Sequence, residues 1–348
     1  MSRKLITIST IMTLMSTSVI ADVPNVAADI APIHSLVSRV MDGVGAPKLI
    51  VQSGASPHGY RLRPSEAKAL QDADHVFWMG EELTPWLDSA IGTLASKASV
   101  TTLLDQQGVI LHDFREGALF EAHDHSAHGD DDHDDHDDHD DHDDHDDHDD
   151  HKDHDDHKDH DDHDDHKDHD DHDDHDDHGS HDPHAWLSPE NAKLWLNIIA
   201  SKLSVSDPEN AATYFMNAAA GQAEIEAMIA EVKATLKPVQ GGKFVVFHDA
   251  YQYFENDFDF YASGAISLGD SSDPSPARIE KVQKRIRDEG IQCVLAEPQF
   301  KKGLVATVME GSDATASVID PLGAELETGP KLYTRLIKNM AKTLRNCL

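Results

Sequence analysis

The sequence predicts an α/β protein of two lobes, interrupted by a long acidic, histidine-rich tract. Outside residues 123–181, short apolar runs alternate with helical patterns, and each run ends at a polar residue, a glycine or a proline. That alternation is typical of α/β folds. About 290 of the 348 residues remain when the tract is set aside, a length that favours two medium-sized lobes around hydrophobic cores.

Eight short apolar runs are candidate strands, four in each half of the chain. In the first half they are Pro24–Ala28, Lys48–Gln52, His75–Met79 and Val109–His112. In the second half they are Phe244–Phe247, Tyr261–Ile266, Cys293–Ala296 and Ser317–Ile319.

Three helices have clear starts, each an N-cap residue followed by proline at the first helical position. They begin at Ser188-Pro189, Asp207-Pro208 and Ser275-Pro276, which predicts helices near 189–204, 208–237 and 276–289. The second would be about 45 Å long at 1.5 Å per residue. Because it lies between the halves and its apolar residues follow helical spacing, we expect it to connect the lobes rigidly, rather than to be an ordinary surface helix.

The tract itself points to metal handling. It repeats Asp-Asp-His, with a histidine at every third position from His133 to His178. Imidazole is the commonest protein ligand for zinc, copper and nickel, whereas a solvated spacer would need only the aspartates. A three-residue repeat turns 300° per step on a helix, so successive histidines cannot form a chelating i, i+4 pair. We therefore expect a disordered, low-affinity metal collector, with a charged spacer as the alternative.

The charge of the chain argues against nucleic-acid binding. The formal net charge is −37, of which −28 lies in the tract, where 31 aspartates accompany 3 lysines. The remainder is mildly acidic, with 35 acidic and 26 basic residues, and offers no basic stripe for phosphates.

The first 21 residues have the pattern of a secretory signal peptide. Basic residues precede an apolar stretch from Leu5 to Ile20, and the small residues before Asp22 fit cleavage after about Ala21. No later stretch is long and apolar enough to span a bilayer, so we expect an exported protein without membrane insertion. No cysteine follows the signal to carry a lipid anchor.

The two cysteines, Cys293 and Cys347, are expected to form a disulfide, because an exported chain encounters an oxidising compartment. A catalytic or metal-bound thiolate is the rival interpretation, although there is no CxxC spacing to favour it.

Three histidines are expected to lie just after predicted strands. His58, His184 and His248 lie in three separate loops, two in the first half and one in the second. A single loop histidine is usually solvated or caps a helix. Ligands of open α/β sheets, however, bind beyond the carboxyl ends of strands, and three imidazoles suit Zn²⁺ with a carboxylate or water completing the tetrahedron. The sequence therefore predicts a zinc site that bridges the lobes.

From about Val23 to Leu348 the chain resembles the periplasmic zinc-binding receptors of ABC uptake systems, the ZnuA type in a cluster that also includes manganese receptors. The acidic, histidine-rich insert before the second histidine is itself a trait of the zinc members. The resemblance rests on Pro57-His58-Gly59-Tyr60 with Arg63-Pro64-Ser65, Asp182-Pro183-His184-Ala185-Trp186-Leu187, Phe247-His248-Asp249-Ala250-Tyr251-Gln252-Tyr253-Phe254, Glu297-Pro298-Gln299-Phe300 and Ile319-Asp320-Pro321-Leu322-Gly323.

This resemblance implies two Rossmann-like α/β lobes with parallel sheets, a long rigid connecting helix and zinc in the cleft between the lobes. The domain boundaries would be 1–21 for the signal, 22–207 for the N-terminal lobe with the tract as an inserted loop, 208–237 for the connecting helix and 238–348 for the C-terminal lobe.

The ligands implied by the family are His58, His184 and His248. Some zinc members carry glutamate immediately before the first histidine, but Pro57 stands there in this chain. Asp320 aligns with an aspartate of the manganese relatives and is a candidate fourth ligand, with water as the alternative. His248 replaces a carboxylate of those relatives, which favours zinc over manganese. His34 is expected either to line the cleft or to cap a helix.

The predicted function is therefore that of a non-enzymatic, monomeric zinc receptor of the periplasm, which delivers Zn²⁺ to the membrane permease subunit of an ABC importer. Two alternatives stay open. A secreted zinc hydrolase would use the same three histidines but lacks a His-Glu-x-x-His motif, and Asp182 and Asp249 are better explained as carboxylates that orient imidazoles. A metal buffer would depend on the tract alone.

Overall fold

A computed structural model describes residues 23–115, 119–120, 181–267, 269, 274–299 and 302–348. The predicted signal peptide, with its cleavage point after Ala21, and the repeat of the histidine tract lie outside these residues. In the part of the chain that is described, none of the helices combines the length and apolar character of a membrane span.

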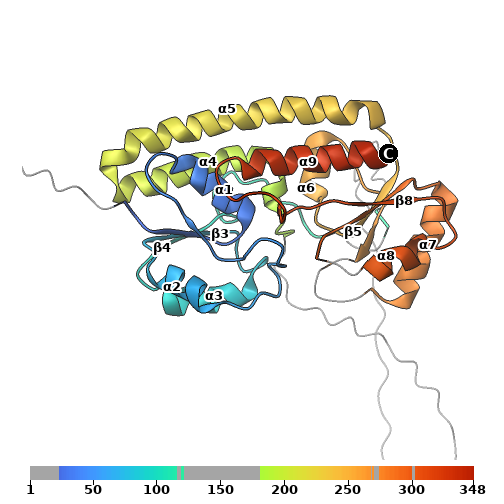
Figure 1. The fold of residues 1–348 in the computed structure, drawn as a ribbon, viewed down its shortest axis with the longest axis horizontal. Coiled ribbons are helices and arrows are strands. Elements are labelled where there is room, and N and C mark those ends of the chain that lie inside the picture. Colours follow the sequence, from blue (N-terminus) through green and yellow to red (C-terminus); the bar gives the residue numbers. More distant parts are fainter. Residues whose placement is uncertain (1–22, 116–118, 121–180, 268, 270–273, 300–301) are drawn as a thin grey trace, which may run out of the picture. The chain divides into compact units, whose positions relative to one another are not determined.

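The structure contains two four-stranded parallel sheets, which confirm the predicted α/β class with a parallel sheet in each lobe (Figure 1). The first sheet has the order β2-β1-β3-β4 and the second has the order β6-β5-β7-β8. The strands of the first are β1 (Val26–Ala28), β2 (Lys48–Leu49), β3 (His75–Trp78) and β4 (Ser99–Thr102). Those of the second are β5 (Phe244–His248), β6 (Ala265–Ser267), β7 (Cys293–Ala296) and β8 (Thr315–Val318).

Seven of the eight strands overlap their predicted positions, but the predicted strand at Val109–His112 is wrong. The fourth strand of the first sheet is β4, in which Val100 is the one apolar residue and is exposed, so that the sequence shows no apolar run there. The segment at Val109–His112 stays outside the sheet because a side chain satisfies its backbone. The amide of Ile110 donates to Asn191 Oδ1 at 2.8 Å, and Asn191 Nδ2 donates back to the Ile110 carbonyl at 3.0 Å.

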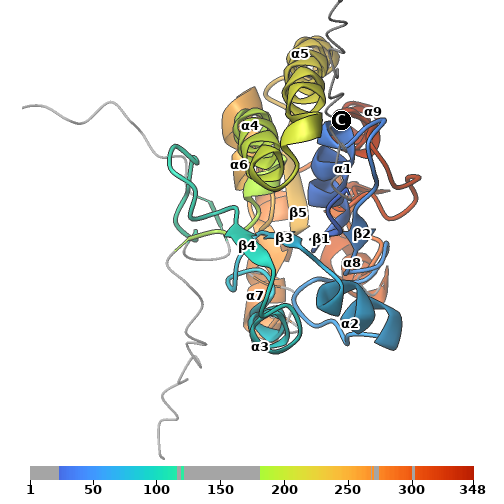
Figure 2. The same ribbon diagram turned by 90° about the vertical axis from the view of Figure 1, so that its left-hand side faces the viewer.

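Helices cover both faces of each sheet. Beside the first sheet lie α1 (Ala31–Val40) and α4 (Pro189–Ser206) on one face and α2 (Pro64–Gln71) and α3 (Pro85–Leu94) on the other (Figures 1 and 2). Beside the second lie α6 (Gln252–Phe258) and α9 (Leu332–Cys347) on one face and α7 (Pro276–Glu289) and α8 (Lys302–Met309) on the other. Successive side chains of β5 therefore point to opposite faces of the sheet. Val246 packs in the core that includes α9, whereas Val245 packs with residues of α7.

The helix starts are confirmed at the level of single hydrogen bonds. The side chains of Ser188 and Ser275 accept from the amides three residues on, at the starts of α4 and α7. Asp207 caps a 3₁₀ turn, Pro208–Asn210, which leads into α5 (Ala211–Leu236).

Helix α5 runs beside α1, α4 and α9, and in Figure 1 it lies next to α9 along its second half. The largest core cluster includes buried residues of α5, of α1 and α4, and of β5 and α9. One continuous apolar core therefore joins elements that flank the first sheet to elements that flank the second.

His34 lies in α1, where its Nε2 atom is 3.1 Å from the Pro47 carbonyl and its Nδ1 is 3.4 Å from the Ser38 hydroxyl. It therefore neither caps the helix nor joins the metal-ligand cluster described below. Burial lowers the pKa of His34 below its usual value of 6.5.

This lowered pKa predicts a loss of stability in mild acid. The unfolded chain protonates His34 near pH 6.5, whereas the folded chain resists protonation until the pH is lower, so the unfolding free energy falls as the pH drops below 6.5. The loss from this one group is at most about 1.4 kcal/mol per pH unit. His34→Gln, which keeps a donor for Pro47, should flatten the profile. Urea unfolding at pH 7.5, 6.5 and 5.5 measures the unfolding free energy of both proteins. If it depends on pH equally in the two, His34 is not the group responsible.

Candidate metal site

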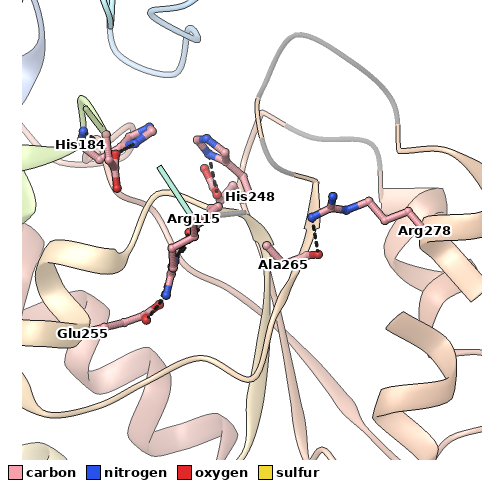
Figure 3. Close-up of polar contacts among 9 residues, drawn as sticks. Arg115, His184, His248, Glu255, Ala265 and Arg278 are labelled. Atoms are coloured by element: carbon pink, nitrogen blue, oxygen red, sulfur yellow. Dashed lines mark hydrogen bonds and ion pairs between the residues drawn. The ribbon is translucent and has the colours of Figure 1, made fainter. Parts of the chain in front are cut away.

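Three imidazoles from three separate segments meet at one point. His58, His184 and His248 each offer one ring nitrogen, and these nitrogens lie within 4.8 Å of one another. The ring centroids are 5.6 Å apart for His58 and His184, 6.0 Å for His58 and His248 and 4.8 Å for His184 and His248. His184 and His248 are 3% exposed. Figure 3 shows the rings of His184 and His248 directed toward each other.

The loop that carries His58 is held in place by hydrogen bonds on both sides. Trp86 Nε1 donates to the Pro57 carbonyl at 2.7 Å. On the other side, the buried carboxylate of Glu66 accepts from the Tyr60 hydroxyl at 2.8 Å and from the Arg63 amide at 2.7 Å, which closes a capping box at the start of α2. The loop thus leaves β2 and ends at a capped helix, which fixes His58 between them.

His184 directly precedes a 3₁₀ turn, Ala185–Leu187, and is oriented by a buried carboxylate. Its Nδ1–H donates to Asp182 Oδ1 at 2.6 Å, so that Nε2 is the nitrogen left to face the cluster. The turn is anchored to elements of the second half, because Trp186 Nε1 donates to the Pro321 carbonyl at 2.8 Å and the Tyr333 hydroxyl donates to the Trp186 carbonyl at 3.0 Å.

His248 ends strand β5, where parallel strands present their carboxyl ends. Its Nδ1 lies 3.5 Å from Glu297 Oε1, and Gln299 Nε2 donates to the other oxygen of that carboxylate at 2.7 Å. Glu297 follows β7, the strand beside β5, and is 3% exposed. A buried carboxylate thus lies within ion-pair distance of the His248 imidazole.

The predicted role of one carboxylate, Asp249, differs in the structure. Asp182 orients an imidazole, as expected, but the carboxylate of Asp249 binds the guanidinium of Arg115 instead. Asp320 is not part of the three-histidine cluster. Its carboxylate accepts from the amides of Leu322, Gly323 and Ala324 at 2.6–3.0 Å, which stabilises the turn after β8.

Three residues near the site make contacts that the sequence did not predict. Glu297 could have been found by applying to carboxylates the rule used for the histidines, because it directly follows the predicted strand Cys293–Ala296. Arg115 and Glu255 had no such signal, since their contact depends on how residues distant in the sequence meet in the fold.

A model of one protein family, the zinc-uptake complex component A, periplasmic (ZnuA), matches residues 26–347. The chain belongs to this family. It is 48% identical over 323 residues to the high-affinity zinc uptake system protein ZnuA of Brucella abortus, covering 93% of this chain and 91% of that one. It is 44% identical over 329 residues to the protein of the same name from Paracoccus denitrificans, covering 94% and 93%.

A crystal structure of ZnuA shares the fold with a TM-score of 0.67 at 20% identity, covering 94% of this chain and 99% of that one. The recognition of the ZnuA type from the sequence motifs is thus confirmed.

The donor set of this ZnuA-family chain suits zinc. Neutral imidazoles bind Zn²⁺ with Zn–N distances of about 2.0–2.1 Å, so two ligands of one tetrahedral ion lie roughly 3.4 Å apart. The observed limit of 4.8 Å means that the three nitrogens need to move closer by little more than about 1 Å to hold one ion. A shift of that size is within the reach of side-chain and loop adjustment.

A substitution at Asp182 tests whether its carboxylate orients the imidazole of His184 for zinc binding. Asp182→Asn keeps the size of the side chain but weakens its hold on His184 Nδ1–H, so the zinc affinity should fall by about 10–100-fold. Competition with a chromogenic zinc chelator measures this fall. Asp320→Asn is the matched control, because Asp320 binds only backbone amides among the described residues, and a fall of equal size there would contradict the role of Asp182.

Proposed function

We propose that this chain is a non-enzymatic, monomeric receptor of the periplasm that binds Zn²⁺ through His58, His184 and His248 and delivers it to the membrane permease subunit of an ABC importer. The observation that carries the proposal is the convergence of three imidazole nitrogens within 4.8 Å from three separate segments. Membership in the zinc-uptake family supports the identity of the metal and the compartment. Residues 1–21 would be the export signal.

Water is the proposed fourth ligand, in place of Asp320. The three backbone amides that bind Asp320 would each lose a partner if its carboxylate turned toward the ion. A water ligand can leave without any rearrangement of the protein, which suits a receptor that has to release its ion as well as capture it.

The continuous core suggests how capture and release occur. Helix α5 packs on α1, α4 and α9, so a wide hinge motion would break apolar contacts along its length. We propose that zinc is bound and released through small shifts of the three ligand segments.

The hydrolase alternative gains no support. Asp182 is bound to His184, Asp249 to Arg115 and Glu297 to Gln299. Asp182 and Asp249 are therefore held by other residues, and Glu297 also lies beside the imidazole of His248, so these contacts give no sign of a general base.

The tract is proposed to be a collector of weakly bound zinc that is separate from the high-affinity site. A variant lacking residues 123–178 tests this, since it keeps the pairing of Asp113 with His181 at the ends of the deletion. We expect calorimetry to show one tight zinc equivalent in both proteins and several weaker equivalents in the full chain alone. Loss of the tight equivalent would favour the metal buffer, and equal total stoichiometry would contradict the collector.

A further inference from the structure

Arg115 is placed between two buried carboxylates, a position that the proposed ligand set does not explain. Its guanidinium binds Asp249, with Nε 3.0 Å from Oδ1 and 3.1 Å from Oδ2, and it binds Glu255, with Nη1 2.6 Å from Oε2 and Nη2 3.3 Å from Oε1 (Figure 3). The guanidinium carbon also lies 3.6 Å from the centre of the Phe120 ring. Asp249 directly follows the ligand His248.

The segment that carries Arg115 passes from one half of the protein to the other. Ile110 is held by Asn191 of α4, as described above. Two residues later, the amide of His112 donates to the Tyr253 hydroxyl of α6 at 3.1 Å. Arg115 then adds the contacts with Asp249 and Glu255, so residues 110–115 link α4 to α6 and to the end of β5.

The segment that carries His184 is paired with the same stretch. Asp113 and His181 form an isolated antiparallel bridge, and the amide of Asp182 donates to the His112 carbonyl at 2.8 Å. The Tyr253 hydroxyl in turn donates to the Asp182 carbonyl at 2.7 Å. Residues 112–115 are therefore attached both to the segment of His184 and, through Arg115, to the residue next to His248.

We propose that Arg115 is a positioning residue for zinc binding, which holds His184 and His248 close enough to each other for one ion to draw them together. The inference rests on the proposed receptor function. The guanidinium is suited to this because its planar fork binds two carboxylates at once, whereas a lysine ammonium is a point charge that cannot form the same set of parallel hydrogen bonds. With Arg115 in place, the two imidazoles are held near each other before zinc arrives, so that only a small shift remains to be made, which slows the loss of the bound ion.

The alternative role is purely structural, in which Arg115 only neutralises Asp249 and Glu255. Glu255→Gln distinguishes the two roles. It removes one buried charge but leaves Arg115 bound to Asp249, so it should alter stability without loosening the link to His248.

The experiment uses the full chain with one equivalent of zinc and measures ion release into an excess of chelator by stopped flow, together with urea unfolding. Arg115→Lys and Arg115→Gln should release zinc at least about tenfold faster than the wild type and bind it about 10–100-fold more weakly. Glu255→Gln should stay within about threefold of the wild-type release rate. Arg278→Lys is the matched control, because Arg278 donates hydrogen bonds to the carbonyls of Ala265 and Ile266, while the lysine keeps the positive charge that acts on Asp249.

Three results would overturn the role of Arg115. The first is a wild-type release rate in Arg115→Lys, which decides the matter even if Arg115→Gln fails to fold. The second is a zinc-release rate that rises in every variant, Glu255→Gln included, in proportion to the loss of unfolding free energy. A wild-type chain that holds no zinc ion tightly would overturn the receptor function itself, and the role of Arg115 with it.

Discussion

Replacing His58, His184 or His248 with alanine is expected to lower the zinc affinity by a factor on the order of a thousand, or about 4 kcal/mol of binding free energy. The effect is large because each imidazole is one of only three protein nitrogens in the cluster, and water is a poorer ligand than imidazole. The variants should be made in the chain lacking residues 123–178, so that the histidines of the tract do not mask the loss.

Competition titration against a chelator of known affinity gives the measurement for these three variants. His75→Ala is the matched control, since His75 is a buried histidine whose Nε2 lies 2.6 Å from the Ser206 hydroxyl and which is outside the cluster. Wild-type affinity in any one of the three cluster variants would remove that residue from the ligand set.

Reduction of the disulfide between Cys293 and Cys347 should lower the unfolding free energy by roughly 4 kcal/mol, because the bond closes a loop of about 55 residues in the unfolded chain. The structure contains this bond, as predicted from the sequence, and it ties the last residues of α9 to strand β7. Urea unfolding with and without reductant measures the loss.

The control for this measurement is the double variant Cys293→Ala and Cys347→Ala, whose stability should not respond to reductant. Thiol labelling of the denatured, unreduced wild type should find no free thiol. Two labelled thiols, or a transition that reductant leaves unchanged, would contradict the expectation.

The strands that could be predicted from the sequence are those with apolar side chains on buried faces. Strands such as β3 and β5 are buried along their whole length, and both were found at nearly their observed positions. Strand β4 is an edge strand with exposed residues, so burial imposes no apolar pattern on it. At Val109–His112 the apolar residues have the pattern of a strand, but Asn191 supplies the hydrogen bonds that a neighbouring strand would have given.

The site could be predicted as far as local sequence determines it. The three histidines follow or precede regular elements, and the convergence of parallel strands at one edge brings loop residues together. The orientation of the His184 imidazole by Asp182 follows from a contact two residues away, which is also local. The link through Arg115 could not be predicted, because it joins residues more than 130 positions apart.

Helix α9 packs against α1 and α5. Its last residue, Cys347, forms the disulfide with Cys293 of β7. The first helix of the described fold therefore lacks part of its packing until α9, which follows all its other described partners, has been synthesised. At a translation rate of about 5–20 residues per second, the nascent chain remains incomplete for tens of seconds. Until α9 has been made and has packed against α1 and α5, the apolar core that these three helices share is incomplete.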